Sequence, residues 1–227
     1  MKKVLLSIST LCVATMLILI ASCSKSNTPA NPNVLVTHAS PDAPGVDLYV
    51  NGTKVNPTAL TYGNNTGYLS VAAGATNVKV DVTGTMTTVI NANLTLSTGA
   101  NYSVFAIDSV SNIQPLVLVD TLTVPSGNNA GIRFIHLSPN APAVDILDSA
   151  SLTVLISNVS FKGYTSFLTF PAGGPSTLYV CAHGSTTPVV KIPSFVPASG
   201  HIYTIFAKGF LGGTGTQALG YQVITNK

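Results

Sequence analysis

Two stretches of the sequence carry the residue types of a serine-hydrolase triad: a histidine, a serine followed by a proline, and an aspartate. They are His38, Ser40, Pro41 and Asp47, and His136, Ser138, Pro139 and Asp145. In such a triad the histidine takes the proton of the serine and the aspartate orients the histidine, so all three must lie within hydrogen-bond reach. In an extended strand, His38 and Ser40 would share a face about 7 Å apart, which is too far.

A structural role fits this motif better. Pro41 and Pro44 favour a turn out of the strand, in which Ser40 and Asp47 can hydrogen-bond to local backbone and the histidine can cap the turn. A corner that defines the fold must recur in every copy, whereas an active site need not. The sequence therefore predicts a structural motif, no catalytic residue and no enzymatic activity.

Other candidate sites are weaker. A metal could be bound by His38, Asp42 and Asp47, but Asn140 replaces Asp42 in the second stretch, which weakens the oxygen ligand set. We therefore expect no metal and no other cofactor. The glycine-rich segment 209–216 superficially resembles a phosphate loop, but it lacks the lysine and a following helix, so it predicts a mobile hairpin.

The segments that must position these residues occur twice in the chain, as an internal sequence repeat. Four blocks recur in the same order, at an offset that grows from 98 to 101 residues. The matching blocks are 34–47 with 132–145, 68–74 with 167–173, 77–82 with 177–182, and 97–106 with 198–207. A period near 100 residues is too long for a solenoid unit, so each copy is expected to be a domain.

The sequence of each copy predicts a set of short β-strands. β-branched and aromatic runs recur every 8–12 residues between turn signals, and Val78, Val80 and Val82 alternate with Asn77, Lys79 and Asp81. Seven or so such strands per copy predict an all-β chain of two tandem immunoglobulin-like antiparallel β-sandwich domains. We place the first sandwich at residues 34–126 and the second at 131–227.

The N-terminus has the pattern of a bacterial lipoprotein signal. Lys2 and Lys3 precede an apolar run to Ile20, and Ile20-Ala21-Ser22 leads into Cys23. We expect residues 1–22 to be cleaved, Cys23 to be acylated with chains such as palmitate, and residues 23–33 to form a flexible, solvated tether. The alternative is an uncleaved anchor, since the apolar run is near the lower limit for spanning a bilayer.

Charge and cysteine content exclude a nucleic-acid-binding protein and a disulfide-stabilised scaffold. After the signal, eight lysine and arginine residues face seven aspartates, so the formal charge falls from +3 to +1 and no basic patch suits nucleic acid. Cys12 leaves with the signal and Cys23 carries lipid, so Cys181 has no disulfide partner. Because Cys181 occupies the slot of Asp81 in the first copy, we expect its thiol on the less buried face of its strand.

The doubled His-x-Ser-Pro-x-Ala-Pro-x-Val-Asp signature resembles a family known as domain of unknown function 4397. The resemblance covers about residues 33–225, and members of that family are often lipoproteins of the Bacteroidetes. It implies a secreted β protein and brings no established activity.

We therefore expect a non-enzymatic, lipid-anchored cell-envelope protein that acts as an interaction or spacer module. The alternative is an envelope lipoprotein that binds a glycan or peptide, although the chain has no tryptophan and its tyrosines and phenylalanines largely repeat at core-like positions. An envelope hydrolase comes third. The expected location is the outer membrane, with the periplasmic side favoured over the cell surface because the tether lacks an acidic run. The expected partners are the membrane and an envelope protein or glycan.

Overall fold

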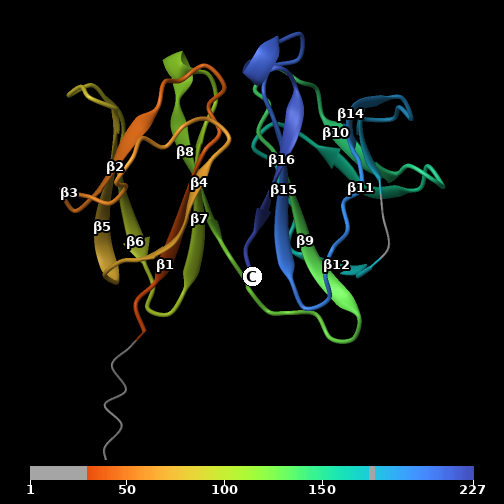
Figure 1. Ribbon diagram of the computed structural model, residues 1–227, viewed down its shortest axis with the longest axis horizontal. Helices are drawn as coiled ribbons and strands as arrows, with labels where there is room; N and C mark the ends of the chain where they lie inside the picture. The colour runs from red at the N-terminus through yellow and green to blue at the C-terminus, as the bar shows by residue number, and fades with distance from the viewer. Residues whose placement is uncertain (1–29, 174–176) are drawn as a thin grey trace, which may run out of the picture.

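A computed structural model describes residues 30–173 and 177–227 as two β-sandwiches side by side (Figure 1). The predicted signal peptide, Cys23 and most of the tether lie outside the described residues. Within the described part of the chain, no helix is long and apolar enough to cross a membrane.

The first sandwich contains two four-stranded sheets, in the orders β4-β1-β7-β8 and β3-β2-β5-β6, and a short 3-10 helix, η1. Its elements are β1 (Asn33–His38), β2 (Val46–Val50), β3 (Thr53–Lys54), β4 (Asn65–Ser70), β5 (Gly74–Val82), β6 (Thr88–Leu96), β7 (Asn101–Ile107), η1 (Val110–Asn112) and β8 (Gln114–Val119).

The second sandwich has the same strand order, in sheets β12-β9-β15-β16 and β11-β10-β13-β14. Its elements are β9 (Asn129–His136), β10 (Val144–Asp148), β11 (Val154–Val159), β12 (Leu168–Pro171), β13 (Leu178–Ala182), β14 (Pro188–Ile192), β15 (Ile202–Lys208), η2 (Gly215–Gln217) and β16 (Gly220–Thr225). The predicted all-β sandwich fold is confirmed. Each sandwich also contains one parallel pair, β1 with β7 and β9 with β15, in its otherwise antiparallel sheets.

The alternation of buried and exposed residues explains most of these strands. In β5, Val78 and Val80 are buried while Asn77 and Lys79 are half-buried, as the sequence pattern predicts. Asp81 departs from the pattern, because it is buried. Each sandwich encloses one apolar core between its two sheets, built in the first around Val36, Leu48, Val80 and Val104, and in the second around Phe134, Ile146, Val180 and Ile205.

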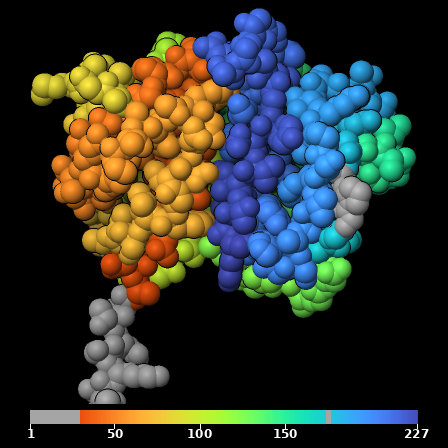
Figure 2. Space-filling view, viewed as in Figure 1, coloured from red at the N-terminus to blue at the C-terminus, as the bar shows by residue number. Residues whose placement is uncertain are grey.

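A third apolar cluster joins the two sandwiches. Sheet β4-β1-β7-β8 faces sheet β12-β9-β15-β16, and Phe105 meets Phe206 edge to face at 5.8 Å between ring centroids. The other buried members are Leu35, Ala39, Ile107, Leu118, Ile135, Leu137 and Ile224. In the space-filling view the two halves meet along their whole length (Figure 2). The molecule is therefore a four-layer stack of sheets around three cores.

Strand direction sorts the connections to opposite ends of this stack. The described chain begins at the lower end in Figure 1, where the C-terminus and the crossing between the sandwiches also lie. Strands β1, β7, β9 and β15 all run away from that end. The connections that follow them, 39–45, 108–113, 137–143 and 209–219, therefore gather at the upper end.

Candidate functional site

The two motif histidines occupy equivalent buried corners. His38 and His136 are both fully buried, and each Nε2 lies 2.9 Å from a proline carbonyl oxygen, of Pro44 and Pro142 respectively. The Nδ1 of His136 accepts a hydrogen bond from the backbone N–H of Ser138 at 3.3 Å, so Nε2 carries the proton and donates it to Pro142. Burial lowers the pKa of both imidazoles. The histidines therefore hold the corner closed in their neutral form.

The motif serines are also fully buried. Ser138 Oγ donates to the carbonyl oxygen of Gly209 at 2.6 Å. The backbone partner of Ser138 is distant in the sequence, because the parallel pairing of β9 with β15 brings the end of β15 to the corner. Gly209 has φ +84°, and a Cβ there would meet the carbonyl oxygen of Ala218 at 2.1 Å. In the first corner, Ser40 Oγ and His38 Nδ1 have no hydrogen-bond partner among the described residues.

Asp42 and Asn140 fasten the corners to the neighbouring connection. Asp42 Oδ1 accepts from the N–H of Val110, and Asn140 Oδ1 accepts from the N–H of Leu211, both at 2.8 Å. Asn140 thus fills the role of Asp42 with an amide oxygen, and its Nδ2 also donates to the carbonyl oxygen of Leu211 at 3.0 Å. Across residues 30–173 and 177–227, no group of three or more His, Cys or Asp side chains is placed to hold a metal.

The motif aspartates do not complete a triad. Asp47 lies on the outer face of its sheet, where its carboxylate binds Lys54 Nζ at 3.0 Å and Thr83 Oγ1 at 3.2 Å. The hydrogen bond from Lys54 lowers the pKa of Asp47. Its partners are the side chains of Lys54 and Thr83 and the backbone of Gly84, which is distant in the sequence, and not the local backbone that we expected. Within the described chain no hydrogen bond joins Asp47 to His38 or Ser40.

Asp145 is the equivalent residue in the second copy. Its carboxylate accepts hydrogen bonds from His183 Nδ1 at 2.9 Å, Ser157 Oγ at 3.1 Å, and the backbone N–H groups of Asn158 and Gly184 at 2.7 and 2.9 Å. Burial alone would raise the pKa of Asp145, but these four donors hold it well below its usual range. The arrangement ties β10 to β11 and β13.

A family model described as domain of unknown function 4397 matches residues 32–147, just over half of the chain. The protein belongs to this family. The match begins before β1 and ends in β10, so it includes both buried corners and crosses from one sandwich into the other. No curated protein matches the chain.

The prediction that Cys181 lies on the less buried face of its strand is wrong for this DUF4397 protein. Cys181 is a free thiol but is fully buried, beside Asp145 on the neighbouring strand. Its burial raises the pKa of the thiol. The inference failed because Asp81, in the equivalent slot, is itself buried and is satisfied by Lys79 at 2.7 Å and Thr88 at 2.7 Å. A paired carboxylate does not mark an exposed face.

The most unusual polar group in the DUF4397 fold was missed by the sequence interpretation. Arg133, the only arginine in the chain, is 2% exposed between the sandwiches, and its Nη1 donates to Asp120 Oδ1 at 2.8 Å. Its guanidinium also stacks over Phe167, 4.5 Å from the ring centroid. The sequence did contain one sign of this buried charge: a single arginine stands between two large apolar residues, Ile132 and Phe134, of a predicted strand.

Hydroxyl and amide groups from both sandwiches complete this network. Ser103 and Tyr68 donate to Asp120 Oδ2 at 2.6 and 2.5 Å, Arg133 donates to Thr204 at 2.9 Å, and Thr204 donates to Asn226 at 2.7 Å. The strand registers place four pairs at equivalent positions of the two copies: Leu35 and Arg133, Tyr68 and Phe167, Ser103 and Thr204, Asp120 and Asn226. The duplicated interface is therefore near-symmetric, with the positive charge in one copy and the negative charge in the other.

A groove of about 420 Å³ opens beside this ion pair. Its walls are the end of β8 with the following crossing on one side and the segment before β12 on the other. It is lined by Val119, Thr121, Thr123, Arg133, Tyr164, Thr165, Ser166 and Phe167.

Proposed function

We propose that this protein is a non-enzymatic, lipid-anchored module of the cell envelope in which a flexible tether carries two fused β-sandwiches away from the membrane. The observation that carries the proposal is the run Ile20-Ala21-Ser22-Cys23, followed at once by a polar, proline-containing segment. A lipid on Cys23 and a tether of about 30 Å, at about 3.1 Å per residue, would suit a spacer or interaction module.

The arrangement of the fold supports this role. The described chain begins at one end of the stack, so an anchor there would leave the connections at the opposite end, including both motif corners, facing away from the lipid (Figure 1). Because a buried ion pair and an apolar core join the sandwiches, they would project as one body. We place the protein at the outer membrane, and we favour its periplasmic side.

The absence of catalysis is part of the proposal. The support is that the second corner's imidazole and hydroxyl, those of the motif histidine and serine, are fully buried. Both groups are hydrogen-bonded to backbone groups, which belong to Pro142, Ser138 and Gly209. A general base and a nucleophile need access to substrate.

Substitution of the lipidated cysteine tests the anchor. Cys23→Ala should move the protein from the detergent phase to the aqueous phase on Triton X-114 partitioning, with unchanged thermal unfolding, because all lipid attachment depends on one thiol. Cys12→Ala, in the same signal, is the matched control and should stay in the detergent phase. If the Cys23→Ala variant remains in the detergent phase with the control, an uncleaved helix anchors the chain and the proposal is wrong.

A further inference from the structure

We infer that the groove between the two sandwiches binds an uncharged saccharide that carries acetamido groups. The inference concerns a site beyond the proposed anchoring role and does not depend on it. The groove of about 420 Å³ falls within the range of small-molecule sites, roughly 300–1,000 Å³. It is built from both copies, since β8 comes from the first and residues 164–167 from the second.

The electrostatics of the groove favour a neutral ligand. Arg133 lies in its lining, but its charge is already balanced by Asp120 at 2.8 Å. Among the described residues, the second N–H of Arg133 Nη1 has no acceptor, because Nε and Nη2 bind Thr204 and Ser103 while Nη1 binds only Asp120. Because Arg133 and Asp120 form a pair that is neutral as a whole, a carboxylate ligand gains no net charge attraction in the groove. A neutral acceptor such as an amide carbonyl oxygen can accept from the free N–H without bringing an unbalanced charge.

The groove also offers apolar surface to a sugar ring. Tyr164 is 55% exposed and Val119 is 65% exposed, and both lie in the lining. Tyr164 is the only aromatic residue among the strongly exposed large apolar side chains of the described chain. A phenol ring suits the C–H face of a pyranose, and Val119 suits an acetamido methyl group.

The remaining lining favours hydroxyl groups over a peptide backbone. Thr121, Thr123 and Ser166 are exposed and offer hydroxyls that both donate and accept. Further along β8, Lys162 Nζ donates to Gln114 Oε1 at 3.0 Å and joins the same two edges. This bridge crosses between the two sandwiches at the start of β8.

Calorimetric titration of the detergent-solubilised full chain tests the inference, with chitotriose and cellotriose as probes. Chitotriose should bind about fourfold more tightly than cellotriose, the factor given by burying one methyl group. Tyr164→Ala should weaken chitotriose binding roughly tenfold through loss of ring contact. Tyr179→Ala, a half-buried tyrosine on the outer face of the second sandwich, is the matched control and should bind as the parent does.

A second variant guards against a change in local packing. Val119→Ala should reduce the preference for chitotriose, whereas Val196→Ala, which is 50% exposed elsewhere, should not. The inference is overturned if neither sugar binds at millimolar concentration, if both bind equally, or if binding survives Tyr164→Ala. It is also overturned if an unacetylated tripeptide binds the groove more tightly than chitotriose does.

Discussion

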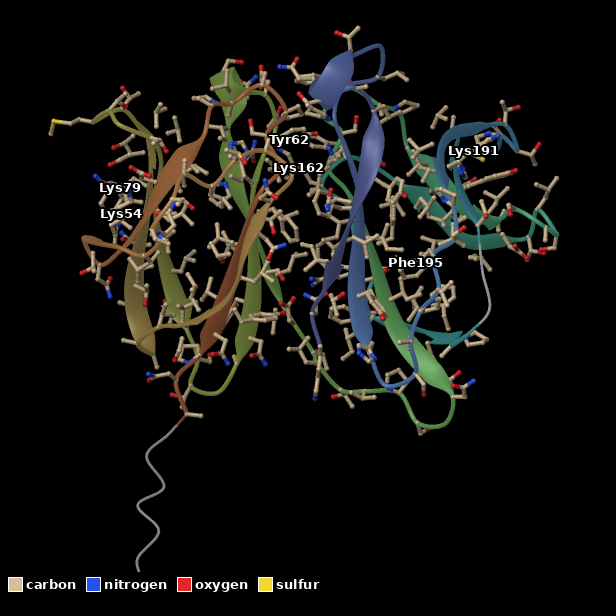
Figure 3. All side chains as sticks on the ribbon, viewed as in Figure 1. Lys54, Tyr62, Lys79, Lys162, Lys191 and Phe195 are labelled. Carbon is tan, nitrogen blue, oxygen red and sulfur yellow. The ribbon has the colours of Figure 1, made fainter. Side chains whose placement is uncertain are left out.

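At the residue scale, burial decides what the motif side chains do. Histidine, serine and aspartate are the residue types of a hydrolase triad, but the second corner uses its histidine and serine for backbone hydrogen bonds out of contact with solvent. The outer faces show the same principle for charged groups. Lys54 and Lys79 lie on the outer face of the first sandwich, and Lys191 lies on the outer face of the second (Figure 3). Lys54 and Lys79 pair with the aspartates of their own sheet.

The buried histidines predict that stability depends on pH. Burial lowers the folded-state pKa of His38 and His136 below 6.5, so below pH 6.5 the unfolded chain binds protons that the folded chain does not. The contribution of the two histidines to the free energy of unfolding should therefore be constant between about pH 7 and 8. It should fall as the pH drops from 6.5, by up to about 1.4 kcal/mol per pH unit for each histidine.

Urea unfolding at pH 5, 6, 7 and 8 measures this dependence. The lowered aspartate pKa values act only near and below pH 3.8, outside this window. His201→Gln, a change at an exposed histidine, should leave the profile unchanged. A flat profile from pH 5 to 7 would show that the corners accept protonated imidazole.

At the element scale, the sequence predicted most of the strands but not which strands pair with one another in the sheets. The four repeated blocks located β1, β2, β5 and β7 and their counterparts. The two-residue strand β3 was missed, because Asn51-Gly52 marks a turn and Thr53–Lys54 is too short to show alternation. Strand β4 begins at Asn65, directly after Gly63-Asn64, two residue types that are typical of turns. Parallel pairing of β1 with β7 depends on contacts about 70 residues apart, which no local pattern encodes.

The packing of sheet on sheet between the copies predicts a specific double-mutant result. Arg133→Leu should lower the free energy of unfolding by about 3–5 kcal/mol, because Asp120 would be left buried and uncompensated. Asp120→Asn alone should also destabilise. The double variant Arg133→Leu/Asp120→Asn should recover most of the loss, since Leu35 and Asn226 already occupy the equivalent positions of the other copy. Denaturant unfolding of the four proteins measures the coupling, and additive losses would contradict a direct ion pair.

At the scale of the whole molecule, the two copies have become one structural unit. Duplication was evident from the sequence, but the interface was not, because its charges are not repeated: Arg133 corresponds to Leu35 in the other copy, and Asp120 corresponds to Asn226. The groove went unnoticed for a different reason, since Tyr164 lies outside the four repeated blocks. The family match, which runs from before β1 into β10, also crosses the boundary between the sandwiches.

The most direct test of this account is the cooperativity of thermal unfolding of the full chain by differential scanning calorimetry. If the sandwiches form one body, the scan should show a single transition whose calorimetric enthalpy equals its van't Hoff enthalpy. Two separable transitions, or a calorimetric enthalpy near twice the van't Hoff value, would show that the copies unfold independently. That result would contradict both the rigid spacer and a groove built jointly by the two copies.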